Sequence, residues 1–242
     1  MIAVILAAGM ASRLRPLTND RPKCLLEVGS RCLLQRTMDA LRAAGISEFV
    51  VVTGYLHEMI EQFLQDNYPQ DTIHFINNSD YQTTNNIYSL WLTRPYTDGK
   101  DFLLLDSDIL FDPQIIPTLL DVDGSVLALN RHELGEEEIK VIVDADGKVK
   151  EISKVCSIAD SIGESVGIEK ITANYSEALF NELDIMITGE GLTGVFYEKA
   201  FERLIPQGHT FGIADTTDMF SIELDTVDDF NQARQLIPES LY

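Results

Sequence analysis

The chain has 242 residues, of which 45% are hydrophobic and 24% are charged, as is ordinary for a globular protein. Its 18 basic and 39 acidic side chains give a net charge of −21, so we expect it to bind neither nucleic acid nor an anionic membrane surface. No apolar run approaches the roughly 20 residues that cross a bilayer, and no basic region precedes the apolar residues 2–8, so we expect a cytoplasmic protein.

The first half of the chain alternates between predicted strands and predicted helices. Residues 2–6 form a continuous apolar run, which is typical of a strand buried on both faces. Apolar residues at helical spacing come next, and this first helix is expected to stop at Gly45. We predict strands at 2–6, 49–52, 73–76, 102–105 and 126–129, and helices at 33–44, around 59–64, at 86–92 and at 115–120.

This alternation predicts an α/β fold of three layers, with a mostly parallel, Rossmann-like sheet and helices on both faces. Beyond residue 130 the pattern changes, and residues 131–242 are expected to add a small lobe of β-hairpin and helices. Since the sequence contains no repeat or proline-rich linker, we expect residues 1–242 to form one domain. In the lobe we predict strands at 140–143, 149–153 and 220–224, and helices at 176–186, 197–205 and 227–237.

A loop of small residues, followed by two separated basic side chains, comes after the first strand. Alanine and glycine let a flat ligand approach the backbone, and Gly9 can adopt backbone angles that other residues avoid. Arg13 offers a fork of donors that matches phosphate oxygens, and Lys23 offers a point charge to a second phosphate position. Neither a G-x-G-x-x-G nor a P-loop pattern is present, so the alternative is a plain turn with solvated basic residues. The loop begins with Leu6, Ala7, Ala8 and Gly9.

Carboxylates end two of the predicted strands. Asp106 and Asp108 follow strand 102–105, and Asp225 follows the last strand. Ligands bind such sheets outside the carboxyl ends of the strands, where Mg²⁺ is commonly held by one or two carboxylates together with phosphates and waters. The sequence therefore predicts a magnesium site at these carboxylates. Asp225 can instead serve as the N-cap of the last helix, with Thr226 competing for that role.

The first loop resembles the signature of the nucleotidyltransferase superfamily, which includes sugar-1-phosphate nucleotidyltransferases and phosphocholine cytidylyltransferases. The resemblance rests on Leu6-Ala7-Ala8-Gly9, Arg13 and Pro22-Lys23. It implies that the turn at Ala8 and Gly9 contacts the base and ribose of a nucleotide. Arg13 is then expected to grip the β- and γ-phosphates, and Lys23 to stabilise the α-phosphate and the incoming phosphate. By the same resemblance, Mg²⁺ is bound by Asp108, rather than Asp106, together with Asp225.

Further segments look more like phosphocholine-type cytidylyltransferases than like the sugar enzymes. The polar segment 84–90 implies that Asn86 and Ser89 lie beside the nucleotide, although a plain capped turn is the alternative. Trp91 could stack on a choline head group, but a single tryptophan on an apolar helix face is more typical of a core. The residues expected at the acceptor are Lys154, which resembles a phosphate-binding lysine, Glu164, in a Gly-Glu-x-x-Gly-Ile stretch, and Asp106.

The resemblance implies transfer of CMP from CTP to a phosphorylated small alcohol, such as phosphocholine, with release of pyrophosphate. Residues 1–130 would then bind the nucleotide and residues 131–242 the acceptor. Alternatives are a sugar-1-phosphate nucleotidyltransferase that uses UTP, dTTP or GTP, a glycosyltransferase that uses Asp106-Ser107-Asp108 as a D-x-D motif, and a non-catalytic nucleotide-binding regulator. Segments 188–194 and 211–215 match no acceptor motif, so the sequence leaves the acceptor open, as it leaves the oligomeric state.

Overall fold

The computed structural model of the protein describes residues 1–241. Its strands near residues 2–6, 49–52, 73–76, 102–105 and 126–129 coincide with the apolar runs of the sequence, and every residue of β1 (Ile2–Ala7) is buried, as expected for a central strand covered on both faces. The other strands are β2 (Glu27–Val28), β3 (Arg31–Cys32), β4 (Glu48–Thr53), β5 (Thr72–Asn77), β6 (Phe102–Asp106), β7 (Ile109–Phe111), β8 (Val126–Asn130), β9 (Lys140–Val143), β10 (Val149–Ser153), β11 (Gly163–Ile171), β12 (Gly212–Asp215) and β13 (Ser221–Glu223).

The helices follow the predicted positions closely. None of those within the described residues is long and apolar enough to span a membrane. The helices are α1 (Leu33–Ala43), α2 (His57–Asn67), α3 (Asn86–Leu92), α4 (Arg94–Thr97), α5 (Ile115–Leu120), α6 (Ala173–Asp184), α7 (Glu198–Leu204) and α8 (Val227–Leu236).

A central sheet runs through the molecule in the order β10-β9-β11-β6-β1-β4-β5, and β8 pairs with both β11 and β12. Strands β5, β4, β1 and β6 are mutually parallel, so their carboxyl ends meet along one edge. From β11 onward the pairing is antiparallel, except that β12 runs parallel to β8. The predicted three-layer α/β fold with a mostly parallel, Rossmann-like sheet is confirmed.

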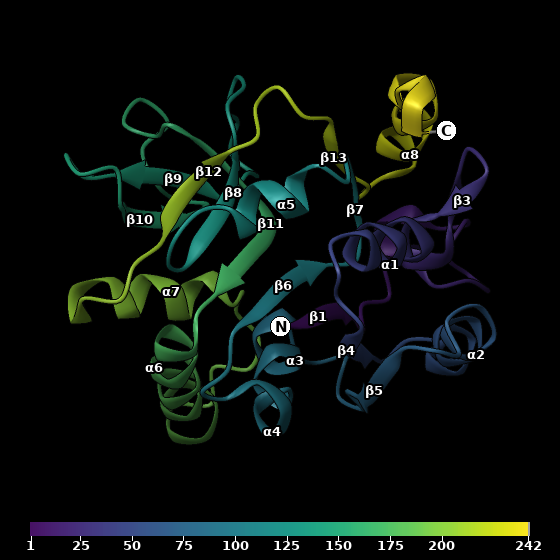
Figure 1. The fold of residues 1–242 in the computed structure, drawn as a ribbon, viewed down its shortest axis with the longest axis horizontal. Coiled ribbons are helices and arrows are strands. Elements are labelled where there is room, and N and C mark those ends of the chain that lie inside the picture. Colours follow the sequence, from purple (N-terminus) through teal and green to yellow (C-terminus); the bar gives the residue numbers. More distant parts are fainter. Residues whose placement is uncertain (242) are drawn as a thin grey trace.

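Helices cover both faces of this sheet, as the amphipathic patterns predict (Figure 1). On one face the apolar sides of α1, α2 and α5 pack on the sheet, for example through Met38, Leu64 and Ile116. On the other face α3, α6 and α7 pack through residues such as Leu90 and Phe180. Each helix buries its apolar stripe against apolar strand residues, which is the dominant favourable term in such a fold.

A third, smaller core holds the two ends of the chain together. It contains Leu14 and Leu26 from the loop after β1, and Leu224 and Phe230 from the segment that leads into α8. The backbone N–H of Leu224 also donates to the carbonyl oxygen of Asp108 (3.0 Å). This core therefore sets residues 13–26 beside the turn after β6 and the start of α8, which lie far apart in the sequence.

Strands β11 and β12 are absent from the prediction. β11 contains Gly163 and Gly167, and its register with β8 shifts between Ser165 and Glu169, so its apolar residues do not alternate regularly. Buried Lys170 is tolerated because its Nζ atom donates to backbone carbonyl oxygens after α5, such as that of Leu120 (3.4 Å). Only tertiary contacts make this segment a strand.

Candidate active site

The turn after β1 is held against the end of the neighbouring strand β4. The backbone N–H of Tyr55 donates to the carbonyl oxygen of Ala8 (3.0 Å), and the Tyr55 hydroxyl donates to that of Thr18 (2.8 Å). A Cβ atom on Gly54 would lie 2.7 Å from the Ala8 carbonyl oxygen and 2.9 Å from the Cβ atom of Tyr81. Glycine at position 54 therefore permits the close approach of the two segments.

Gly9 does not use the conformational freedom that the sequence suggested. The left-handed backbone conformation in this loop occurs at Ala11, with φ of 46°, and not at Gly9. A Cβ atom on Gly9 would meet no atom within 4 Å, because the residue borders the open pocket described below. Gly9 therefore adopts no left-handed conformation here, and its lack of a side chain leaves open space at the pocket wall.

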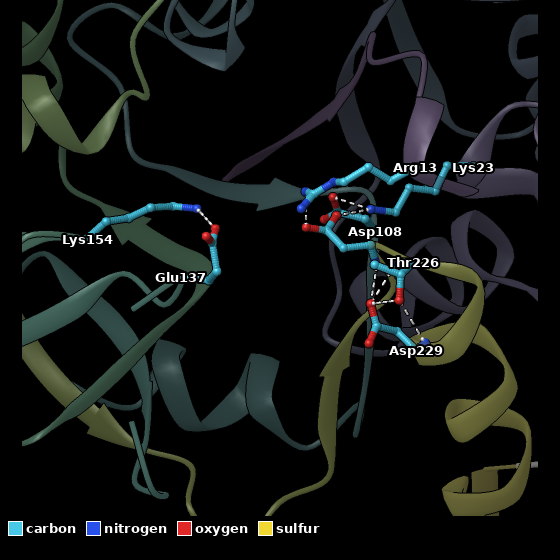
Figure 2. Close-up of polar contacts among 8 residues, drawn as sticks. Arg13, Lys23, Asp108, Glu137, Lys154, Thr226 and Asp229 are labelled. Carbon is cyan, nitrogen blue, oxygen red and sulfur yellow. Dashed lines mark hydrogen bonds and ion pairs between the residues drawn. The ribbon is translucent and has the colours of Figure 1, made fainter. Parts of the chain in front are cut away.

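Both basic residues of the loop converge on carboxylates (Figure 2). The Nζ atom of Lys23 lies 2.9 Å from Oδ2 of Asp108 and 2.8 Å from Oδ1 of Asp225. Arg13 forms an ion pair with the other oxygen of Asp225. The side chain of Lys23 is only 10% exposed, whereas that of Arg13 is 63% exposed. Lys23 is thus fixed in the wall of the site, while Arg13 is free to turn toward a ligand.

These ion pairs change the protonation of their members. Burial opposes the charged form of Lys23, but Asp108 and Asp225 outweigh it and raise the pKa of Lys23 above its ordinary value. Burial also opposes the charged form of Asp225, yet Lys23 and Arg13 leave the pKa of Asp225 below its ordinary value. Both Lys23 and Asp225 are therefore charged at neutral pH.

Three carboxylates gather where β6 and β13 end. One oxygen each from Asp108, Glu223 and Asp225 lies within 4.8 Å of the others. Burial by the surrounding protein, and then the charges of the two aspartates, raise the pKa of Glu223. An all-oxygen donor set with excess negative charge fits a hard divalent cation, and the Lys23 ammonium lies between two of these carboxylates.

The sequence left open whether Asp225 or Thr226 caps α8, and the structure assigns the cap to Thr226. The Thr226 hydroxyl accepts a hydrogen bond from the backbone N–H of Asp229 (3.2 Å), and the Asp229 carboxylate accepts one from the backbone N–H of Thr226 (2.7 Å). This reciprocal capping box satisfies the first turn of the helix without the Asp225 side chain. Asp225 is therefore free to face the pocket.

Asn86 and Ser89, predicted to lie beside a nucleotide, sit on the first turn of α3. Asn85 caps this helix, as in a plain capped turn. The Oδ1 atom of Asn86 accepts a hydrogen bond from the backbone N–H of Tyr197 (2.9 Å), and the Ser89 hydroxyl accepts one from Nδ2 of Asn78 (3.1 Å). Both side chains are thus held in fixed orientations at the pocket wall.

Lys154, expected at the acceptor, lies across the pocket from Arg13 and Lys23 (Figure 2). Its Nζ atom lies 3.4 Å from Oε2 of Glu137 and 5.0 Å from the centre of the Phe196 ring. Glu164 pairs with His132, with 2.6 Å between Oε2 and Nε2. Burial raises the pKa of the Glu164 carboxyl, and the charge of Glu138 raises it further. These effects outweigh the pairing with His132, which lowers it.

A single pocket of about 500 Å³ joins these groups. All the residues that the sequence singled out for a site line it, although their individual roles remain predictions. They are Leu6, Ala7, Ala8, Gly9, Arg13, Lys23, Asn86, Ser89, Asp106, Asp108, Lys154, Glu164 and Asp225.

Several further residues line the pocket without having been predicted, among them Glu223, Glu137, Phe196 and Glu198. Glu223 has a recognisable signal, because in an extended chain residues 223 and 225 project to the same side. Glu137 belongs to an acidic run that is typical of a solvated loop. Phe196 and Glu198 lie in a segment that matches no motif. Trp91, by contrast, is not among the lining residues: it packs on the core, and its Nε1 atom donates to Asp184 (2.7 Å).

The chain is similar in sequence to two curated proteins over most of its length. It is 32% identical over 244 residues to CMP-5'-(3-aminopropyl)phosphonate synthase of Streptomyces rubellomurinus, a match that covers 96% of this chain and 38% of that protein. It is 28% identical over 226 residues to CTP:phosphoglutamine cytidylyltransferase of Campylobacter jejuni, covering 85% of this chain and 88% of that protein. The chain therefore spans less than two thirds of the Streptomyces relative.

The fold is shared with a solved structure of CTP:phosphocholine cytidylyltransferase from Streptococcus pneumoniae. The two superpose with a TM-score of 0.81 at 23% identity, over 98% of this chain and 99% of the other. Residues 3–147, more than half of the sequence, match the model of a family described as the MobA-like NTP transferase domain. This stretch contains the first loop, Asp108 and the parallel strands β1, β4, β5 and β6, and the chain belongs to the family of MobA-like NTP transferase domains.

Proposed function

We propose that this protein is a cytidylyltransferase, which transfers CMP from CTP to a phosphorylated small molecule and releases pyrophosphate. The observation that carries the proposal is the meeting of Arg13 and Lys23 with Asp108 and Asp225 at one pocket. The choice of CTP is supported by the two sequence relatives, whose names specify a CMP product or CTP.

The proposed reaction is an in-line displacement. An oxygen of the acceptor's phosphate or phosphonate forms a bond to the α-phosphorus of CTP, and the bond from that phosphorus to the oxygen bridging to the β-phosphorus breaks. Pyrophosphate leaves with the electron pair of that bond. Because a phosphate monoester is already largely ionised near neutral pH, no general base is needed, and catalysis rests on positioning and charge stabilisation.

Arg13 and Lys23 are proposed to supply that charge stabilisation. The exposed guanidinium of Arg13 would turn from Asp225 to the β- and γ-phosphates, where its fork of donors matches the oxygens. The ammonium of Lys23, held rigidly by its burial, would face the α-phosphate. The turn at Leu6, Ala7, Ala8 and Gly9, with Asn86 and Ser89 opposite, is proposed to hold the base and ribose.

Asp108 and Asp225, with Glu223 beside them, are proposed to hold Mg²⁺. Their oxygens are the ligand type that this ion prefers, and their mutual distances permit a shared cation. When bound, the ion would neutralise part of the triphosphate charge. Lys23 would then exchange its carboxylate partners for phosphate oxygens.

The acceptor is proposed to enter from the side of Lys154. Lys154 would bind the acceptor's phosphate, while Glu164 and Asp106 would contact the rest of the molecule. In this proposal residues 1–130 serve mainly the nucleotide and residues 131–242 mainly the acceptor, within one domain.

The test is a measurement of pyrophosphate release. CTP, UTP, GTP and dTTP would each be paired with phosphocholine, 2-aminoethylphosphonate, 3-aminopropylphosphonate, phosphoglutamine, glycerol phosphate and glucose-1-phosphate, with Mg²⁺ or with EDTA. We expect release with CTP and at least one of these acceptors, and none with EDTA. Asp225→Asn should abolish it, while Asp121→Asn, which removes an exposed carboxylate after α5, should not.

Two results would contradict the proposal in different ways. Release only with UTP, GTP or dTTP and glucose-1-phosphate would replace CTP by another nucleotide and favour a sugar-1-phosphate nucleotidyltransferase. Release with no pair at all would remove the catalytic assignment.

A further inference from the structure

Tyr197 lies beneath the pocket and does not line it. The residue immediately precedes α7, is fully buried, and packs against the apolar core below the sheet. Its two neighbours in the sequence, Phe196 and Glu198, both line the pocket. Tyr197 is therefore in a position to orient the residues of the site without contacting a substrate.

Two polar groups of Tyr197 reach two different walls of the pocket. Its backbone N–H donates to Oδ1 of Asn86 (2.9 Å), on the wall proposed for the nucleotide. Its hydroxyl donates to Oδ2 of Asp106 (3.1 Å), on the side proposed for the acceptor, and lies 3.4 Å from Oε2 of Glu169. Asn86 and Asp106 lie 111 and 91 positions away from Tyr197 in the sequence.

The hydroxyl contact holds one oxygen of the Asp106 carboxylate in place. A Cβ atom on Gly167 would lie 3.1 Å from Oδ2 of Asp106, so this oxygen is enclosed between β11 and Tyr197. A carboxylate oxygen away from water needs a donor, and leaving it without one is unfavourable. Loss of the hydroxyl would therefore let the Asp106 side chain turn away from its position in the pocket.

We propose that Tyr197 is a positioning residue that aligns the acceptor side of the pocket with the nucleotide side, an inference that rests on the proposed function. Its hydroxyl serves the acceptor side through Asp106. Its backbone N–H serves the nucleotide side through Asn86. The two connections are chemically separate, so a substitution that removes only the hydroxyl separates their effects.

Tyr197→Phe tests this directly, because it keeps the ring and the backbone N–H and removes the hydroxyl. The matched control is Tyr175→Phe: Tyr175 is equally buried in the same core, and its hydroxyl has no hydrogen-bond partner among residues 1–241. Steady-state pyrophosphate release would be measured with CTP and phosphocholine, or with the acceptor of the panel above that the wild type uses. Thermal unfolding of each variant would verify that it is folded.

We expect Tyr197→Phe to raise the KM for the acceptor at least tenfold and to leave the KM for CTP within twofold of wild type, since one buried partner is lost on one side only. Asn86→Ala should show the reverse pattern. Tyr175→Phe should change neither KM.

Two outcomes would overturn the inference alone: an active wild type with an unchanged acceptor KM in Tyr197→Phe, or equal changes in both KM values. A folded wild type that releases no pyrophosphate with any pair would instead overturn the proposed function, and this inference with it. The behaviour of the wild type thus distinguishes the two failures.

Discussion

Lys23 occupies two environments in the proposed reaction. In the structure its ammonium lies between Asp108 and Asp225, both within 2.9 Å, and its side chain is almost fully buried. The same carboxylates are the proposed holders of a divalent cation. Since two cations cannot share this space without strong repulsion, the ammonium would compete with the proposed metal ion for the carboxylates until phosphate oxygens offered Lys23 another partner.

Lys23→Met should therefore separate catalysis from metal binding. Removing one positioned donor at a developing charge lowers rates by about 10²–10³-fold, so we expect a loss of that size in kcat. In the protein without nucleotide, however, the same variant should bind Mn²⁺ more tightly than wild type, measured by calorimetry or by electron paramagnetic resonance.

The control is Arg15→Met, which removes an exposed positive charge from the same loop. Within residues 1–241 no ion pair joins Arg15 to these carboxylates, so its Mn²⁺ affinity should match wild type. Equal or weaker Mn²⁺ binding by Lys23→Met would disprove the competition.

Glu198 makes the stability of the ligand-free protein depend on pH. Burial raises the pKa of this carboxyl from 4.5 to about 7, and one of its oxygens has no hydrogen-bond partner among the described residues. Between these values the folded protein holds a proton that the unfolded chain has lost, so stability falls as pH rises from 4.5 to about 7.

Glu198→Gln mimics the protonated form and should remove this loss. At pH 8 we expect its free energy of unfolding to exceed that of wild type by up to about 3 kcal/mol, at about 1.4 kcal/mol per pKa unit, with the gain shrinking toward pH 5. Urea denaturation at pH 5.5, 6.5 and 8 measures the free energy of unfolding of both proteins. Glu177→Gln, at an exposed position on α6, controls for the loss of one negative charge. A gain that is the same at every pH would argue against the assigned cause.

At the scale of elements, the site depends on how closely the loop after β1 approaches the end of β4. The absence of a side chain at Gly54 permits that approach, and the hydrogen bond from the Tyr55 backbone N–H to the Ala8 carbonyl oxygen stabilises it. The turn at Ala8 and Gly9 is thus placed by strand β4, whose residues 49–53 pair in parallel with residues 3–7 of β1.

Gly54→Ala should disturb this placement. Its Cβ atom would press on the Ala8 carbonyl group, which is backbone and cannot move without the loop. We expect a loss of about 1–3 kcal/mol in the free energy of unfolding, as for other overpacked sites, and a higher KM for CTP.

Gly194→Ala is the matched control, since a Cβ atom there meets nothing within 4 Å and the backbone is not left-handed. Denaturation and steady-state kinetics test both variants. If Gly54→Ala were as stable and as active as Gly194→Ala, the loop after β1 would be able to move without loss of stability or activity, and this prediction would be wrong.

At the scale of the whole molecule, the net charge of −21 opposes the approach of an anionic nucleotide. The cations Arg13, Lys23 and Lys154 attract a nucleotide only near the pocket, whereas the total charge repels it over about one Debye length. That length shrinks from about 30 Å at 0.01 M salt to about 8 Å at 0.15 M.

Added salt should therefore speed nucleotide association, with a rise of a few-fold between 0.01 and 0.15 M NaCl. Stopped-flow mixing with a fluorescent CTP analogue measures the association rate constant. An association rate constant that falls as salt is added would mean that attraction by the local cations outweighs repulsion by the total charge as the nucleotide approaches.

The fold and the first loop could be predicted because they depend on local pattern. Continuous apolar runs between amphipathic helices require a sheet covered on both faces, whatever the rest of the chain does. The spacing of Gly9, Arg13 and Lys23 was enough to name the superfamily, and the family match confirms it. Irregular strand β11 could not be predicted, because its charged and glycine residues form a strand only through their tertiary contacts.

Tertiary structure alone decided which side chains meet. Lys23 contacts carboxylates 85 and 202 positions away, and Tyr197 joins Asn86 to Asp106 across similar separations. The local sequence offered both Asp225 and Thr226 as caps of α8 and could not choose between them, and the presence of Phe196 and Glu198 in the pocket has no signal in the local sequence. Periodicity and motif spacing reflect interactions between neighbours along the chain, whereas these contacts arise only when the strands and the small core at α8 have brought distant segments together.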